Sequence, residues 1–253
     1  MNHKIAIVTG GNRGLGKEMA ISLAKKSIDV IITFNNNEIQ ANEVVVLLKN
    51  TYNIQACAIQ LDLSNNESIA PFIVNTKKHL KETFNKEHFD FLINNAGMGR
   101  TVPFMEMTEA IFDEFLNVHF KGVYFLTQQL LPYMKEQGSI INISSGTTRW
   151  SNPGYSVYAS MKGAIEIFTK YLAKELGHRG IRANVVAPGP VETDFNNASI
   201  RNNPQLKTVL SNMSPLGRVG VADDLGGIVA FLCSEEAKWI NGQRIEVSGG
   251  INV

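Results

Sequence analysis

The stretch that decides the fold is Thr9-Gly10-Gly11-Asn12-Arg13-Gly14-Leu15-Gly16. It follows the apolar run 4–8, which is typical of a buried strand, and it precedes residues 17–26, where apolar side chains recur at helical spacing. Glycines let a backbone approach a pyrophosphate closely, and the N-terminus of the next helix offers free N–H groups and a partial positive charge. This order predicts a dinucleotide-binding corner made by Gly10, Asn12, Arg13, Gly14, Leu15 and Gly16. A plain strand-to-helix turn is the alternative.

The composition points to an α/β protein and away from several other classes. The chain has 253 residues, of which 44% are hydrophobic, and its net charge of +1 gives no reason to expect nucleic acid or an anionic membrane as partner. Neither Cys57 and Cys233 nor the five histidines show metal-ligand spacing. We see no signal peptide and no apolar segment long enough to span a membrane, so we expect a cytoplasmic protein without a metal.

Strands and helices alternate from one end of the chain to the other. Further strands are predicted at 29–34, 54–61, 89–93, 139–144, 181–187 and 243–247. Helices are predicted at 38–50, 67–81, 108–135, 155–177 and 221–234. Short crossovers of this kind make a parallel sheet with helices on both faces. We therefore predict a single-domain Rossmann fold over residues 1–253, with a doubly wound parallel sheet of about seven strands.

The end of the second strand bears on which dinucleotide is bound. An NAD-specific protein usually has Asp or Glu there for the ribose 2′-OH, but this chain has Phe34 and Asn35. Together with Arg13 in the glycine loop, this favours a 2′-phosphate and hence NADP(H) over NAD(H). Arg13 as an ordinary solvated loop residue is the alternative. Asp62, after the third strand, could simply cap the next helix.

Tyr158-Ala-Ser-Met-Lys162 is the second stretch that carries chemistry. Residues four apart share a helix face, so the Tyr158 hydroxyl and the Lys162 ammonium can approach one point. A nearby cation lowers the pKa of a tyrosine from its usual value of about 10 and prepares it for acid–base work. Ser145 lies just beyond the fifth strand, where its hydroxyl could hold a substrate carbonyl. An ordinary helix pair and a strand-ending serine are the alternatives.

Together these elements resemble the short-chain dehydrogenase/reductase family over essentially the whole chain. The matching positions are 9–16, Asn94 to Gly97, Ser145, Tyr158 with Lys162, and Pro188-Gly189 with Thr193. The part from Pro215 to Gly250 is similar to the branch that includes 3-oxoacyl-carrier-protein reductases. The resemblance implies an oxidoreductase acting on a small carbonyl or alcohol, a homo-oligomer (tetramer or dimer), and a substrate lid around 194–215.

The resemblance also implies roles for single residues. Tyr158 would donate the proton, Lys162 would hold the nicotinamide ribose, and Ser145 would position the carbonyl. The remaining predicted contacts to the cofactor are Asp62 and Leu63 at the adenine edge, Asn95, Ala96 and Gly97 beside the adenosine, and Pro188, Gly189, Val191 and Thr193 at the carboxamide.

Two positions depart from the family pattern. His119 stands where most relatives have an Asn that supports a water-linked proton relay to the lysine, and Ser248 replaces an Asp before the final glycines. An imidazole can also donate and accept hydrogen bonds, and repulsion by Lys162 should keep it neutral. We therefore include His119 among the candidate catalytic residues; simple packing is its alternative. For the whole chain we predict an NADP(H)-preferring oxidoreductase that interconverts a carbonyl and a secondary alcohol by hydride transfer. The alternatives are an NAD-dependent alcohol or sugar dehydrogenase and a non-catalytic NAD(P)-binding redox sensor.

Overall fold

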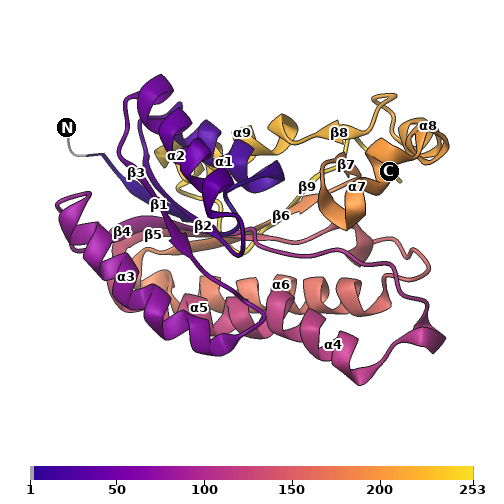
Figure 1. Ribbon diagram of the computed structural model, residues 1–253, viewed down its shortest axis with the longest axis horizontal. Helices are drawn as coiled ribbons and strands as arrows, with labels where there is room; N and C mark the ends of the chain where they lie inside the picture. The colour runs from indigo at the N-terminus through magenta and orange to yellow at the C-terminus, as the bar shows by residue number, and fades with distance from the viewer. Residues whose placement is uncertain (1–2, 253) are drawn as a thin grey trace.

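Seven parallel strands form the central sheet of the computed structural model, which describes residues 3–252 (Figure 1). Their spatial order is β3-β2-β1-β4-β5-β6-β9. The chain changes direction across the sheet between β1 and β4, the point where open α/β sheets bind ligands. The strands are β1 Ile5–Val8, β2 Asp29–Phe34, β3 Ala56–Gln60, β4 Phe89–Asn94, β5 Met134–Ile143, β6 Arg182–Pro188 and β9 Arg244–Val247.

Helices cover both faces of this sheet, as the sequence predicts (Figure 1). On one face lie α1 Gly14–Ala24, α2 Glu38–Tyr52 and α9 Asp223–Leu232. On the other face lie α3 Ile69–Glu82, α4 Glu109–Leu116, α5 Gly122–Leu130 and α6 Ser156–Glu175. Single 3₁₀ turns are η1 Asn66–Ser68, η2 Phe104–Glu106, η4 Leu131–Tyr133, η5 Gly146–Thr148, η6 Gly177–Arg179 and η7 Glu235–Ala237.

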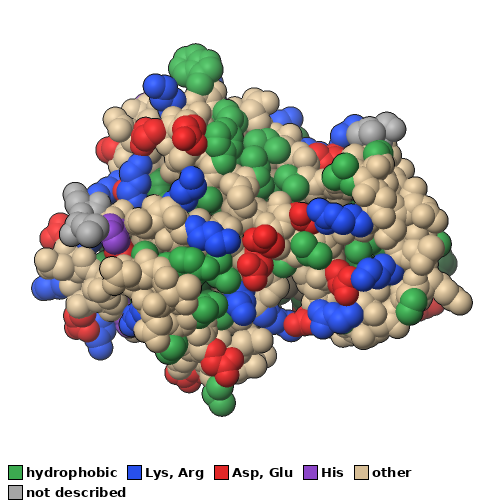
Figure 2. Space-filling model, turned by 90° about the horizontal axis from the view of Figure 1, so that it is seen from above, with side chains coloured by type: hydrophobic (Ala, Val, Ile, Leu, Met, Phe, Trp, Pro, Cys, Tyr) green, Lys and Arg blue, Asp and Glu red, His purple; other side chains and the backbone are tan. Residues whose placement is uncertain are grey.

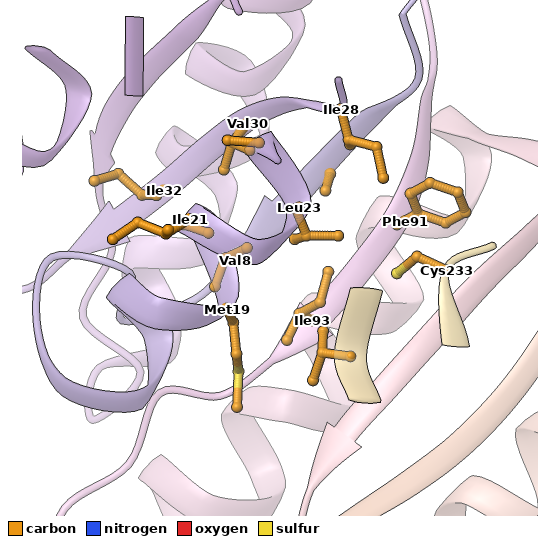
Figure 3. Close-up of a cluster of buried hydrophobic side chains, with 14 of the residues drawn as sticks. Val8, Met19, Ile21, Leu23, Ile28, Val30, Ile32, Phe91, Ile93 and Cys233 are labelled. Carbon is orange, nitrogen blue, oxygen red and sulfur yellow. The ribbon is translucent and has the colours of Figure 1, made fainter. Parts of the chain in front are cut away.

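The core consists of two apolar layers, one on each face of the sheet. Because side chains alternate along a strand, Val8 packs against the α1 side while Ile7 packs against the α3 side. Figure 3 shows the first layer, in which Met19 and Leu23 of α1 lie over β1 and β4. Cys233 belongs to this layer, and both it and Cys57 are free thiols in the interior. Burial raises the pKa of Cys57 to about 12 and also raises that of Cys233.

The single long helix predicted over 108–135 is wrong. Residues Asn117–Lys121 form a π-helix, η3, that separates α4 from α5, and the helical segment ends before Met134, where β5 begins. Pro132 lies in the closing 3₁₀ turn, and its ring cannot continue an α-helix. Gly138 does not end a helix but lies within β5, where a Cβ would come 2.6 Å from the Asp90 carbonyl oxygen. The regular spacing of apolar residues led to a predicted helix that runs past Pro132 and into the first residues of β5.

The other predicted elements are present, with ends that differ by a few residues. The first helix starts at Gly14 rather than at residue 17, so the last glycines of the loop form its first turn. After β6 the chain adds two short elements that the sequence did not reveal, the paired strands β7 Val191–Glu192 and β8 Gly220–Val221. Between them lie α7 Phe195–Asn202 and α8 Pro204–Met213, at one end of the molecule (Figure 1).

Charges of both signs are distributed over the surface. In Figure 2, basic and acidic side chains alternate across the visible face, as expected for a net charge of +1. No helix within residues 3–252 has the length and apolarity needed to cross a bilayer. In the same range, no three His, Cys, Asp or Glu side chains are grouped so that they could hold a metal ion.

Candidate active site

The glycine loop after β1 is held against the segment that follows β4. The Thr9 hydroxyl accepts hydrogen bonds from the backbone N–H groups of Asn95 and Ala96, both at 2.9 Å. Asn95 Nδ2 donates to the Thr9 carbonyl oxygen at 2.9 Å. A Cβ at Gly16 would lie 2.2 Å from the Gly10 carbonyl oxygen, and Gly10 has a left-handed φ of 64°. Because these positions have no side chain, the loop can adopt this tight conformation. Its backbone and the N-terminus of α1 are then accessible to a pyrophosphate.

The far end of this corner carries the residues predicted to select the dinucleotide. Arg13 is exposed and forms no ion pair with any residue from 3 to 252. A cavity of about 260 Å³ opens beside it, with Lys17 and Gln40 also in its lining. Asn35 Nδ2 lies 3.5 Å from Asp62 Oδ1, so the ends of β2 and β3 meet. The exposed Arg13 guanidinium is a group that suits a phosphate.

Asp62 binds the next turn of the chain but does not cap the helix that follows. Its Oδ1 accepts hydrogen bonds from the backbone N–H and the hydroxyl of Ser64, at 2.9 and 2.7 Å. Asn65, rather than Asp62, caps the following 3₁₀ turn. The Leu63 side chain is buried in the core, so it offers only its backbone to a ligand.

The catalytic candidates Tyr158, Lys162 and Ser145 come together at the carboxyl end of β5. Tyr158 and Lys162 lie one turn apart on α6, and both side chains are buried. The Ser145 side chain lies close enough to the Tyr158 hydroxyl to lower the pKa of that tyrosine. Lys162 Nζ donates to the Ile143 carbonyl oxygen at 2.8 Å and lies 5.7 Å from the centre of the Tyr158 ring. The neighbouring Ser144 is bound to Glu166 Oε1 at 2.7 Å. Ser145 Oγ accepts from the N–H and the hydroxyl of Thr147, at 3.2 and 3.0 Å, which leaves its own proton for a substrate oxygen.

The electrostatics of this pair differ from the prediction. Burial is the largest influence on Tyr158 and raises its pKa to about 12, while the hydrogen bond with Ser145 acts in the lowering direction. Burial also lowers the pKa of Lys162 to about 8. The predicted lowering of the Tyr158 pKa by Lys162 is therefore wrong, because burial is the dominant influence on this tyrosine and raises its pKa. At neutral pH Tyr158 holds its proton and Lys162 is mostly charged.

His119 lies within the π-helix and against the same tyrosine. Its ring makes an edge-on contact with Tyr158, with 5.1 Å between ring centres, and is 1% exposed. Nε2 lies 2.9 Å from the Met98 carbonyl oxygen, to which it donates as the protonated ring nitrogen, and Nδ1 is buried with no partner. Burial first and Lys162 second lower the pKa of His119 well below its usual value, so the predicted neutral ring is confirmed.

Gly97 has a second reason to be glycine besides a cofactor. A Cβ there would lie 3.0 Å from His119 Cε1. The predicted glycine and the unusual histidine therefore occupy the same small space, and the ring fits because Gly97 has no side chain.

The segment from Pro188 to Thr193 closes over the glycine loop. Gly189 N–H donates to the Val247 carbonyl oxygen at 3.0 Å, and a Cβ at Gly14 would meet the Thr193 Cβ at 3.9 Å. Val191 pairs with Gly220 in the short β7–β8 ladder. This segment therefore lies between the end of β9 and the glycine loop, with Thr193 beside Gly14.

The backbone of the glycine loop fits a dinucleotide. A Cβ at Gly10 would meet Ala96 and one at Gly16 would meet the Gly10 carbonyl oxygen, so only glycines allow the backbone to follow this tight path. The turn leads into the N-terminus of α1, whose N–H groups suit a pyrophosphate, and the exposed Arg13 lies in the same loop.

A family model described as Enoyl-(Acyl carrier protein) reductase matches residues 10–252. The chain is 36% identical over 251 residues to 3-oxoacyl-[acyl-carrier-protein] reductase FabG of Aquifex aeolicus, covering 98% of this chain and 97% of that protein. The chain belongs to the short-chain dehydrogenase/reductase family, in the branch that resembles the 3-oxoacyl-carrier-protein reductases. It is therefore an NAD(P)-dependent oxidoreductase that acts on a carbonyl or alcohol.

Two further relatives of this dehydrogenase/reductase are reductases of ring ketones or phenols by name. The hydroxynaphthalene reductase-like protein Arp2 of Metarhizium brunneum is 33% identical over 258 residues, which cover 98% of this chain and 94% of that protein. The crystal structure of the angucycline C-6 ketoreductase LanV with bound NADP superimposes with a TM-score of 0.93 and 32% identity, over 98% of this chain and 95% of that one.

Several side-chain contacts of this dehydrogenase/reductase site could not be predicted from the sequence. Asn196 Nδ2 donates to the Tyr155 hydroxyl at 2.9 Å, and the Thr101 hydroxyl lies 3.3 Å from the same oxygen. Phe195 brings its ring to 5.9 Å from that of Tyr158. Nothing in the spacing of these residues foretells their contact, because they come from three loops far apart in the chain. The motif-bearing residues, in contrast, converge as predicted.

Proposed function

We propose that this protein is an NADP(H)-preferring carbonyl reductase in which Tyr158 donates the proton. The observation that carries the proposal is the buried contact of Tyr158 with Ser145 beside Lys162, at the strand ends next to the glycine loop. Bound NADPH would supply the hydride. A tyrosine with a raised pKa keeps its proton at neutral pH, which suits donation to a carbonyl oxygen during reduction.

Each remaining residue has a proposed part in that proton transfer. Ser145 would orient the substrate oxygen toward the Tyr158 hydroxyl. The Lys162 ammonium would bind the nicotinamide ribose and, with that position fixed, stabilise the phenolate that forms as the proton leaves. Pro188 to Thr193 would hold the carboxamide.

His119 has the free acceptor that a relay needs. Its Nδ1 is buried and unpaired, while Nε2 is fixed by the Met98 carbonyl. An unpaired buried acceptor is costly, so a water or hydroxyl that reaches Nδ1 would be held there. We propose that His119, kept neutral, passes a proton between solvent and the Lys162 side of the site.

We also propose an assembly and a lid for this enzyme. Large apolar side chains stand exposed on α5 and α6, and such clusters mark association surfaces; they are Tyr124, Phe125, Ile167 and Tyr171. We expect a homo-oligomer, a tetramer or a dimer, in the cytoplasm, with residues 194–215 as the substrate lid. Light scattering at increasing protein concentration measures the assembly, and a monomer throughout contradicts it.

The experiment that tests the function is a panel of ketones with both coenzymes. Because relatives are named for acyl-carrier, naphthalene and angucycline substrates, the panel contains 2-tetralone as a fused-ring ketone and ethyl acetoacetate as a β-ketoester. We expect NADPH oxidation with at least one of them and a lower kcat/KM with NADH. A protein that binds NADPH but reduces nothing across a broad panel is a sensor instead, and a preference for NADH contradicts the coenzyme assignment.

A further inference from the structure

Three consecutive residues at the end of β5 are each bound by one side chain of α6. Those side chains, Tyr158, Lys162 and Glu166, lie four residues apart and therefore share one helix face. Lys162 Nζ donates to the carbonyl oxygen of residue 143, Glu166 Oε1 accepts from the hydroxyl of residue 144 at 2.7 Å, and the Tyr158 hydroxyl lies close to the side chain of residue 145. Two of these side chains belong to the proposed proton transfer, whereas Glu166 has no part in it so far.

Glu166 is paired with an arginine from the edge strand β9. Arg244 Nε donates to Glu166 Oε1 at 2.8 Å, and its Nη2 reaches the Ser145 carbonyl oxygen at 3.3 Å. The Thr148 hydroxyl lies 2.7 Å from Glu166 Oε1 and 2.9 Å from the same Ser145 carbonyl oxygen. The Ser145 carbonyl oxygen is thus contacted by a guanidinium and a hydroxyl, and the Glu166 carboxylate contacts both of these groups.

The contacts that Glu166 and Arg244 make at the Ser145 turn are largely shielded from solvent. The side chains of Glu166 and Arg244 are 17% and 19% exposed, and Glu246, the second carboxylate on Arg244, is 14% exposed. Removing one partner of such a pair leaves a charge that water cannot solvate fully, so the surrounding backbone must move. The backbone that is bound most directly is that of Ser145.

The pair is not needed to keep β9 in the sheet. Backbone pairing with β6 already holds this strand over Arg244 to Val247. The guanidinium instead reaches across to the loop after β5, 99 residues earlier in the chain. Its position matches a task at the Ser145 turn better than a task in the sheet.

We propose that Glu166 and Arg244 are positioning residues for the reaction: they fix the Ser145 turn so that its hydroxyl faces Tyr158. This rests on the proposed function, in which that hydroxyl orients the substrate carbonyl. Displacing a positioning group by about 1 Å can cost on the order of 10²-fold in rate. The pair therefore controls turnover without touching substrate or cofactor.

The test is a double-mutant cycle in the full-length enzyme, with 2-tetralone and NADPH as the probe. Arg244→Met and Glu166→Gln are each made in the parent and in Ser145→Ala. In the parent we expect kcat to fall by roughly tenfold or more, with the NADPH Kd within about twofold. In Ser145→Ala the same changes should cost less than about twofold, because they act through the hydroxyl already removed. Arg149→Met is the matched control, since it takes an arginine from Glu246 without touching Ser145.

A second readout does not depend on turnover. Amide hydrogen exchange over 144–148 should quicken in Arg244→Met and stay unchanged in Arg149→Met. Unchanged exchange, or a full additional loss of kcat in the Ser145→Ala background, overturns the proposal. If Arg244→Met does not fold, Glu166→Gln, which keeps the shape and one acceptor, is judged by the same criteria. A further outcome separates the two proposals: Ser145→Ala and Tyr158→Phe both keep parental turnover, while exchange quickens in Arg244→Met as expected. In that case the proposed function fails, but Glu166 and Arg244 still fix the backbone of the Ser145 turn.

Discussion

Two strand-to-helix corners at the same edge of the sheet are built in opposite ways. The corner after β1 is emptied of side chains: at Gly10 and Gly16, neighbouring backbone atoms stand where a side chain would begin. After β5 the corner is filled, and Ser145 is surrounded by side chains from α6 and β9. The first corner suits a large anion that must touch backbone N–H groups. The second suits proton transfer, which needs groups fixed to within a fraction of an ångström.

The difference teaches how each corner can fail. An emptied corner is damaged by adding atoms, and a filled one by removing them. Substitutions in the emptied corner should therefore weaken cofactor binding, whereas substitutions in the filled corner should lower turnover.

The largest effect is expected in the filled corner, from a single oxygen. Tyr158→Phe removes the proposed proton donor while keeping the ring that packs against His119. Turnover should drop by about 10² to 10⁴, the usual cost of losing a general acid, with NADPH affinity and melting temperature nearly unchanged. Steady-state kinetics, cofactor titration and thermal unfolding measure the three quantities. Lys162→Ala is the contrast, because it should weaken NADPH binding too. Turnover of Tyr158→Phe within tenfold of the parent would refute the assignment.

In the emptied corner, one added methyl group should do comparable harm to binding. A Cβ at Gly16 would lie 2.2 Å from the Gly10 carbonyl oxygen, so Gly16→Ala must displace the loop. Overpacking costs about 1–3 kcal/mol, which corresponds to roughly 10- to 100-fold in the NADPH Kd if it falls on the bound state. Calorimetric titration measures the Kd. Parental affinity in Gly16→Ala would show that the loop is not the dinucleotide cradle.

Gly227→Ala is the matched control for that substitution. Gly227 is exposed within α9, and a Cβ there has nothing within 4 Å. Adding the same methyl group should raise the free energy of unfolding by up to about 1 kcal/mol, because alanine favours a helix over glycine. Cofactor affinity should not change.

A smaller effect is expected at the far end of the emptied corner. Arg13→Ala should lower the preference for NADPH over NADH by about tenfold, since a charge-assisted hydrogen bond to phosphate contributes roughly 1.5–3 kcal/mol. The comparison of kcat/KM for both coenzymes measures it, and NADH serves as the internal control. Equal weakening of both coenzymes would mean that Arg13 does not contact the 2′-phosphate.

A modest effect on turnover is expected at His119, whose ring contacts Tyr158. His119→Asn should keep turnover within about tenfold, whereas His119→Ala should lose more than that, a modest share of an acid–base effect. Initial rates between pH 6 and 9 measure both variants. Equal turnover of His119→Ala and the parent throughout this range removes His119 from the mechanism.

The same residue makes stability depend on pH. Its pKa in the folded protein lies well below the ordinary value of 6.5, so below pH 6.5 the unfolded chain takes up a proton that the folded protein refuses. The free energy of unfolding should therefore fall as the pH falls, with a slope approaching about 1.4 kcal/mol per pH unit. His119→Asn should lack this contribution. Urea unfolding between pH 5 and 7.5 measures it, and identical slopes in both proteins contradict a buried neutral ring.

The emptied corner could be predicted from the sequence because a Cβ would collide with the backbone at Gly10 and Gly16. These positions must therefore be glycine, and the shape of the turn fixes their spacing. The same holds for Tyr158 and Lys162, whose distance is set by one turn of helix. The partner of Glu166 could not be predicted, since Arg244 lies 78 residues away and any long basic side chain could have served. The helix end at Pro132 was available in the sequence, but apolar periodicity in the preceding turns outweighed it.

Predicted charge effects were the least reliable. Proximity of Lys162 suggested an acidic tyrosine, yet the desolvation that raises the Tyr158 pKa depends on burial, which sequence spacing does not reveal. At His119 burial and the cation act in the same direction, so there the prediction survived.

The buried thiols make the protein convenient for site-specific labelling. Cys57 and Cys233 are 8% and 2% exposed, and burial suppresses the thiolate on which maleimide chemistry depends. A fluorophore directed to a newly introduced cysteine should therefore meet little background from the native protein. Gln205 is an exposed position on α8, so Gln205→Cys would place a reporter on the segment between β7 and β8. Its emission would then register any movement of that segment when NADPH or a ketone is added.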